Sequence, residues 1–287
     1  MIRSQPFFLA RGEDRGERFC IFHPPQLGCC GRVLHIHPLA EEMNKSRRMA
    51  ALQSRALAAA GFAVLQIDLL GCGDSSGDFG DAGWADWLED LAAATEWLNT
   101  NAKIYENASK RDSHSGNCPL WLWGHRAGCL LAVELAHRLA EHCNFVFWQP
   151  PASGKLLLQQ FLRLKVVGDM LGSKASGTMD VMKRNLAAGQ SVELAGYVLS
   201  SSLAKGLEQA TLLPPTKPAQ AIWLELSAQP VADVSPVTSA LAQQWSKAGA
   251  MVKAQPIQGP HFWQTSEIED APALLLATLH GMQSVAP

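Results

Sequence analysis

Residues 121–132, WLWGHRAGCLLA, decide how this chain folds. An apolar run typical of a buried strand stops at Gly124, and an apolar run with helical spacing begins after Gly128. The pentapeptide GHRAG therefore predicts a nucleophile elbow, a sharp strand-to-helix turn that lifts its middle residue above the helix N-terminus. That middle residue is Arg126. A guanidinium has five N–H donors and no acceptor, so it cannot act as a nucleophile.

Strand-like and helix-like patterns alternate around this turn from residue 32 to residue 150. Such alternation predicts right-handed βαβ units and a parallel sheet. The turn-forming RGEDRGE at 11–17 lies between two strand-like runs and predicts an opening β-hairpin. The polar stretch 101–117 predicts a surface loop. The expected strands are 31–38, 62–71, 119–124 and 145–151, and the expected helices are 44–61, 83–100 and 127–142.

The alternation breaks at 152–214 and then resumes. The broken region holds three helical patterns, at 154–172, 178–189 and 203–213, and a short apolar run at 196–200. Strands are expected again at 221–226 and 251–257, and helices at 236–249 and 268–282. We therefore predict a mostly parallel, doubly wound α/β core formed by 1–151 and 215–287, with a helical cap inserted at 152–214.

Composition narrows the class of protein. With 287 residues, 47% hydrophobic and 17% charged, the chain can bury a large core. A net charge of -2 gives no electrostatic reason to expect a nucleic acid or an anionic membrane as partner. The seven cysteines are scattered, which favours reduced thiols and no metal or other cofactor. Without a leader pattern or an apolar run of about 20 residues, we expect a cytoplasmic protein with no transmembrane segment.

Two further residues follow strands at the same expected edge of the sheet. Asp233, in ADVSP, comes after strand 221–226, and His261, in GPHFW, comes after strand 251–257. Elbow, acid and histidine in this order match the catalytic triad of the α/β-hydrolase fold. Each feature alone is weak, because turns often contain D-x-x-P and many histidines are structural. Together they favour that fold.

Longer stretches carry a family resemblance. DLLGCGDSSG (68–77) resembles the D-x-x-G-x-G-x-S-x-G loop of α/β-hydrolases, and HIHPLAEEMNKSRRMAA (35–51) resembles the oxyanion loop and first helix of esterases and lipases. With GHRAG (124–128) and GPHFWQTSEIEDAPAL (259–274), they resemble the exosortase A system-associated hydrolases of the second type. That resemblance covers most of the chain. It implies a bacterial, cytoplasmic protein linked to an exopolysaccharide and protein-sorting locus.

The oxyanion loop and the elbow differ from those of a working esterase. Proline follows His37 where many relatives have glycine, and because proline has no N–H, an oxyanion hole would use the backbone N–H groups of Leu39 and Ala127. His37 is expected to orient the loop. His125 is expected to line the substrate pocket or to fill space beneath it. Cys72 is a weaker candidate nucleophile.

Three functions remain open from the sequence. In the first, Asp233 and His261 activate water to hydrolyse an ester or acyl bond of a small substrate, which can be anionic, while Arg126 anchors it. In the second, the protein is a catalytically inactive binding protein with Arg126 as an anion anchor, or Arg126 pairs with a local carboxylate and plugs the site. In the third, the cap docks a membrane or enzyme partner, such as an envelope or exopolysaccharide pathway protein. The carboxylates considered for Arg126 are Asp74, Glu41 and Glu42.

Overall fold

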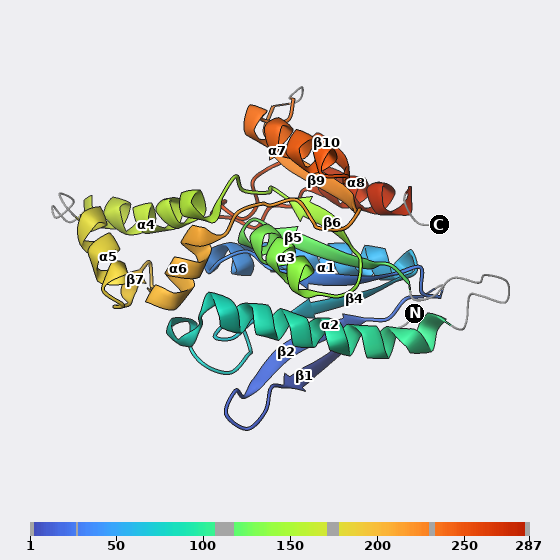
Figure 1. Cartoon of the computed structure of the whole chain (residues 1–287), viewed down its shortest axis with the longest axis horizontal. Helices are drawn as coiled ribbons and strands as arrows, with labels where there is room; N and C mark the ends of the chain where they lie inside the picture. The colour runs from blue at the N-terminus through green and yellow to red at the C-terminus, as the bar shows by residue number, and fades with distance from the viewer. Residues whose placement is uncertain (1–2, 27, 107–117, 171–177, 230–232, 285–287) are drawn as a thin grey trace.

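An eight-stranded sheet forms the centre of the computed structural model, which describes residues 3–26, 28–106, 118–170, 178–229 and 233–284 (Figure 1). The strand order is β1-β2-β4-β3-β5-β6-β9-β10. Strand β2 runs antiparallel to both of its neighbours, β1 and β4, and the six strands from β4 to β10 in this order run parallel to one another. The predicted doubly wound α/β architecture is confirmed. The strands are β1 (Gln5–Ala10), β2 (Glu17–His23), β3 (Gly31–Ile36), β4 (Phe62–Ile67), β5 (Leu120–His125), β6 (Cys143–Trp148), β9 (Gln220–Ser227) and β10 (Met251–Gln258).

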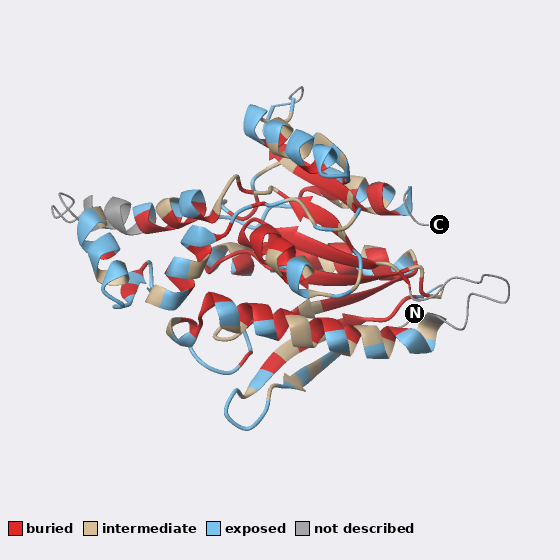
Figure 2. Cartoon of the chain, in the orientation of Figure 1, coloured by how far each residue is buried: buried red, intermediate tan, exposed pale blue. Residues whose placement is uncertain are grey.

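Helices cover both faces of the sheet. Helices α1 (Glu41–Ala59) and α8 (Pro272–Gln283) pack on one face, and α2 (Trp84–Glu106), α3 (Ala127–Arg138) and α7 (Pro236–Lys247) pack on the other. Successive side chains of β5 point to opposite faces of the sheet. Trp121 and Trp123 pack on the α1 side, and Leu120 and Leu122 pack on the α2 side. Strands covered on both sides are largely apolar, and Figure 2 shows the central strands almost wholly buried.

The segment between β6 and β9 extends beyond one end of the sheet (Figure 1). It contains α4 (Gly154–Met170), α5 (Thr178–Ala187), a hairpin of β7 (Val192–Leu194) and β8 (Tyr197–Leu199), and α6 (Ser201–Gln209). The hairpin also contacts the short helix η1 (Phe79–Asp81), where the rings of Phe79 and Tyr197 lie 5.3 Å apart. The limits 152–214 for a separate cap remain a prediction.

Some elements differ from the expected ones. Residues 101–106 of the expected loop belong to α2, because Ala102 is fully buried and Tyr105 packs against the core. Residues 107–117 lie outside the described part of the chain. Strand β7 was not predicted, and α1 begins at Glu41 rather than at residue 44.

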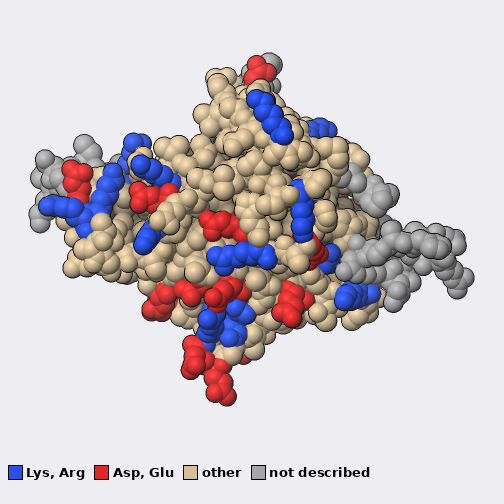
Figure 3. Space-filling view, viewed as in Figure 1, with Lys and Arg blue, Asp and Glu red and all other residues tan. Residues whose placement is uncertain are grey.

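Three global properties bear on function. Acidic and basic side chains are interspersed on the face that Figure 3 presents, in keeping with the small net charge. Over the described residues, no helix is long and apolar enough to cross a membrane. All seven cysteines lie in the described residues, no disulfide joins them, and all but Cys30 are buried.

Candidate functional site

The turn after β5 has the backbone geometry of a strand-to-helix elbow. Arg126 has φ 53° and ψ -115°, a positive-φ conformation outside the left-handed α region, and strain of this kind costs a non-glycine residue about 1–3 kcal/mol. Its N–H donates to the carbonyl of Trp148, 3.0 Å away, which ties the turn to β6. A Cβ on Gly124 would lie 2.6 Å from Cys129 Cα, and one on Gly128 would lie 2.1 Å from the carbonyl oxygen of Ile36. The two glycines are therefore what allow α3 to begin against β5 and the end of β3.

The Arg126 side chain is held by residues from three separate segments. Its Nη2 donates to Glu42 Oε1 on α1 at 3.0 Å and to Gln160 Oε1 on α4 at 2.9 Å. Its Cζ lies 5.9 Å from the centre of the Trp263 ring, within cation–π range. Only 11% of the side chain is exposed. Among the described residues, Nη1 has no hydrogen-bond partner, so this nitrogen is the part of the guanidinium that remains available to a ligand.

Glu42 lies in the first turn of α1, and that helix begins directly after a second residue with positive φ. Ala40 precedes the helix with φ 51° and ψ -126°, nearly the conformation of Arg126. Gln149, which follows β6, has φ 50°. Three of the four non-glycine residues with positive φ in the described chain thus follow the adjacent strands β3, β5 and β6. Backbone strain of this kind is concentrated at functional sites in many proteins.

His261 and Asp233 are not brought together by a hydrogen bond. His261 lies after β10, with its Nε2 3.0 Å from the carbonyl oxygen of Leu226 and its ring stacked on Trp263 at 4.9 Å. If Nε2 donates to that carbonyl, Nδ1 is the basic nitrogen of the ring. Asp233 is exposed and, over the described residues, has no hydrogen bond or ion pair. The Leu226 carbonyl, not an acid, orients the imidazole here.

The residues expected to bind an oxyanion are buried beside the elbow. Leu39 is 6% exposed and Ala127 is 1% exposed, and neither backbone N–H has an acceptor among the described residues. The ring of His37 lies 2.8 Å (Nδ1) from the Pro38 carbonyl, and its Nε2 accepts from the Leu69 N–H at 3.3 Å. These contacts join the loops after β3 and β4. That His37 orients the oxyanion loop remains a prediction.

His125 fills space beneath Arg126. Its ring is fully buried and lies 5.1 Å from Trp263, 5.4 Å from Phe262 and 5.9 Å from Trp148. Neither ring nitrogen has a hydrogen-bond partner within the described part of the chain. Burial, reinforced by the Arg126 cation, lowers the pKa of His125 well below its usual value, so the ring is neutral.

The nearby thiols are poorly suited to nucleophilic attack. Burial raises the pKa of Cys72 and of Cys129 far above the usual range. The Cys129 Sγ also lies 3.7 Å from the carbonyl oxygen of Trp148, within the core. Gln160 is the site residue that sequence reasoning missed, because nothing in the amphipathic pattern of α4 distinguishes it from other polar positions.

Comparisons with known proteins define the family. Residues 29–187, more than half of the chain, match the family described as Serine aminopeptidase, S33. The chain is 31% identical to human Protein ABHD12B over 133 residues, which are 46% of this chain and 32% of that protein, so it spans about a third of that relative.

Solved structures resemble the whole chain at low identity. A thermostable carboxyl esterase from Bacillus coagulans superposes with a TM-score of 0.64 at 13% identity, covering 100% of both chains. A soluble variant of monoglyceride lipase from Saccharomyces cerevisiae superposes with a TM-score of 0.60 at 15% identity, covering 99% of this chain and 94% of that one. Identities this low establish the fold alone. On the family match and the fold together, the chain belongs to the serine aminopeptidase S33 family of α/β-hydrolases.

Proposed function

We propose that this α/β-hydrolase binds a small carboxylate ligand through Arg126 and forms no acyl-enzyme at its elbow. In this proposal residue 126 occupies the position of the family's nucleophile. The observation that carries it is the guanidinium itself, buried at the crest of the turn and held by Glu42 and Gln160. A group with no lone pair to donate cannot attack a carbonyl carbon, but it is a strong partner for a carboxylate.

Three donors support binding of an acceptor group at this position. Arg126 Nη1 and the N–H groups of Leu39 and Ala127 are without partners among the described residues. Glu42 compensates the charge of Arg126, so the site is an ion pair with spare donors rather than a bare cation. We therefore expect modest affinity for carboxylates, and higher affinity when the charge of Glu42 is removed.

Hydrolysis through water is the second candidate function. The free N–H groups of Leu39 and Ala127 and the imidazole of His261 favour it. Here His261 would take a proton from water, and Asp233 would have to move to reach His261. In both candidates the ligand belongs to a bacterial exopolysaccharide or envelope pathway in the cytoplasm, as the resemblance to exosortase A system-associated hydrolases implies.

Calorimetric titration with butyrate tests the first candidate. Arg126→Gln should weaken binding at least about tenfold, since a charge-assisted hydrogen bond contributes about 1.5–3 kcal/mol. Arg48→Gln removes an exposed guanidinium and should leave binding unchanged. Equal binding by wild type and Arg126→Gln, or no binding by wild type, would refute the proposal.

Turnover of p-nitrophenyl butyrate separates the two candidates. The first predicts no hydrolysis above the buffer rate and no labelling by a fluorophosphonate serine probe. Hydrolysis that is lost in His261→Ala and kept in His280→Ala would establish the second candidate instead. Labelling that one serine substitution abolishes would contradict both.

A further inference from the structure

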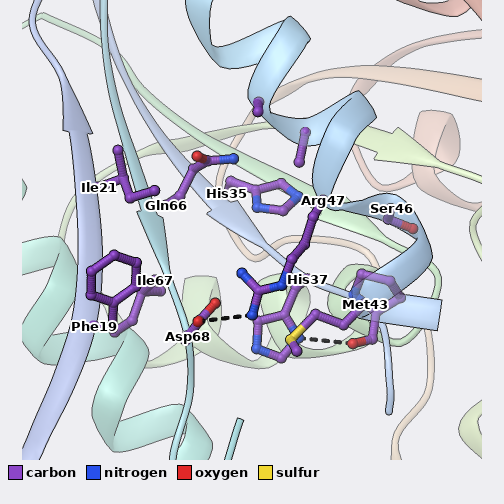
Figure 4. Close-up of a pocket in the computed structure, with 13 residues that line it drawn as sticks. Phe19, Ile21, His35, His37, Met43, Ser46, Arg47, Gln66, Ile67 and Asp68 are labelled. Atoms are coloured by element: carbon purple, nitrogen blue, oxygen red, sulfur yellow. Dashed lines mark hydrogen bonds and ion pairs between the residues drawn. The ribbon is translucent and has the colours of Figure 1, made fainter. Parts of the chain in front are cut away.

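A pocket lies on the α1 side of the sheet. It has a volume of about 200 Å³ and is bounded by α1, β2 and the carboxyl ends of β3 and β4 (Figure 4). His37 and Pro38 of the loop after β3 line it, so it adjoins the oxyanion loop of the site proposed above, but neither Arg126 nor His261 lines it. An inference about it uses neither of those two residues and does not depend on that proposal.

The walls of this α1 pocket are mainly apolar. Phe19 and Ile21 of β2 lie on one side and Met43 of α1 on another, as Figure 4 shows. Small side chains on α1, including Ala51, leave room between the helix and the strands. An apolar enclosure with a few polar groups is the usual composition of a small-molecule site.

The polar side chains at the mouth of the pocket, Arg47, Asp68 and Gln66, already form hydrogen bonds, and their charges cancel. Arg47 Nη2 donates to Asp68 Oδ2 at 2.9 Å, so its charge is compensated at the rim. The Gln66 side-chain oxygen lies 3.2 Å from His23 Nε2, which leaves the amide NH₂ toward the pocket wall. No uncompensated cation or anion lines the pocket, so its chemistry favours a neutral molecule.

One wall of the pocket carries a histidine that has no hydrogen-bond partner. His35 is 5% exposed and lines the pocket, and neither of its ring nitrogens has a hydrogen bond among the described residues. Its ring packs on Trp123 with centroids 4.3 Å apart, which fixes its orientation. Burial lowers the pKa of His35 to about 3, so the ring is neutral and offers one donor and one acceptor.

A buried polar group without a partner costs about 1–3 kcal/mol. Native proteins leave few such groups, so the unpartnered imidazole of His35 at the pocket wall points to a guest that supplies a hydrogen bond.

We propose that the α1 pocket binds a small neutral molecule with an apolar ring or chain and one hydroxyl, which hydrogen-bonds to His35. A phenol matches these requirements: its ring fits between Phe19, Ile21 and Met43, and its hydroxyl can both donate and accept. Water alone is the competing occupant, because water also satisfies buried polar atoms.

A matched pair of probes tests the hydroxyl. In ligand-observed NMR titrations, p-cresol should bind wild-type protein about two- to tenfold more tightly than toluene, since a net hydrogen bond contributes about 0.5–1.5 kcal/mol. His35→Phe keeps an aromatic ring against Trp123 and should abolish that preference. Ala51→Leu should weaken both probes by filling the pocket, and Arg126→Gln should change neither.

Three results of these titrations would overturn the proposal. Equal affinity of wild type for p-cresol and toluene would leave water as the occupant and overturn the proposal, as would no binding of p-cresol. A preference that survives in His35→Phe would place the hydroxyl elsewhere and also overturn it. If His35→Phe fails to fold by far-UV circular dichroism, the wild-type preference for p-cresol and the weaker binding of both probes to Ala51→Leu still decide.

Discussion

Removing the charge of Glu42 is the most direct test of how Arg126 is held. Glu42→Gln keeps the side-chain shape and leaves a neutral amide opposite the guanidinium. The present pair has one hydrogen bond of 3.0 Å and longer contacts of 3.3 and 3.4 Å from Arg126 Nε. The side chains are only 11% and 24% exposed, so water screens the interaction weakly. We expect a loss of about 2 kcal/mol in the free energy of unfolding, in the range for hydrogen bonds to charged groups.

The chain provides a matched control at its surface. Arg48 and Asp270 also form a two-pronged pair, with both contacts at 2.8 Å, but their side chains are 57% and 38% exposed. Distance alone would therefore rank this pair above Arg126–Glu42. Burial predicts the opposite order of stabilisation. Water and salt screen an exposed ion pair, and holding two exposed side chains together costs conformational entropy. Asp270→Asn should destabilise the protein less than Glu42→Gln does.

Urea unfolding of a double-mutant cycle provides the measurement. The cycle combines Glu42→Gln with Arg126→Met, and the coupling energy between the two should be about 1–2 kcal/mol. A coupling near zero, or a larger effect of Asp270→Asn than of Glu42→Gln, would refute the view that a buried ion pair occupies the elbow.

Two further predictions concern the backbone and the buried histidines. Gly128→Ala would place a Cβ 2.1 Å from the Ile36 carbonyl oxygen and should cost more than about 3 kcal/mol in urea unfolding or prevent folding, whereas Gly189→Ala, with nothing within 4 Å and φ 83°, should cost about 1 kcal/mol. The pKa of His35 is about 3 when folded and about 6.5 when unfolded, so the unfolded chain binds the extra proton. The free energy of unfolding is thus not reduced by His35 above pH 6.5, and it falls by up to about 1.4 kcal/mol per pH unit as the pH drops toward 3. His35→Phe should therefore lose less stability than wild type between pH 7.5 and pH 5.

Most of the fold could be predicted because local patterns and tertiary burial agree. Strands covered on both faces are apolar at nearly every position, as in β5 and β6, and helices end where glycine or a loop pattern begins. The extension of α2 was missed because Asn101 and Lys103 are polar, while Ala102 and Tyr105, which face the core, are too few to reveal a helical period.

The site could be predicted only in part, because its contacts depend on helix phase and on the inserted segment. The sequence offered three carboxylates for Arg126. The positive φ of Ala40 sets the start of α1 so that Glu42 faces the elbow, whereas Glu41 accepts from Tyr197 Oη at 3.0 Å. A backbone conformation of this kind has no signature at an alanine. The spacing of Asp233 and His261 fits a triad, but spacing does not determine whether two loops meet.

The elbow and its side chain are physically separable, and this explains how a hydrolase fold can carry Arg126. The turn depends on Gly124, Gly128 and a positive φ at residue 126, none of which requires a hydroxyl. The strained, positive-φ backbone costs about 1–3 kcal/mol at that residue. The ion pair with Glu42 contributes about the same amount, so it can offset the strain. The contact that stabilises the turn is also the one that competes with a ligand for the guanidinium. Glu42→Gln should therefore lower stability and raise butyrate affinity together; if both fall, Glu42 belongs to the ligand site and does not merely restrain Arg126.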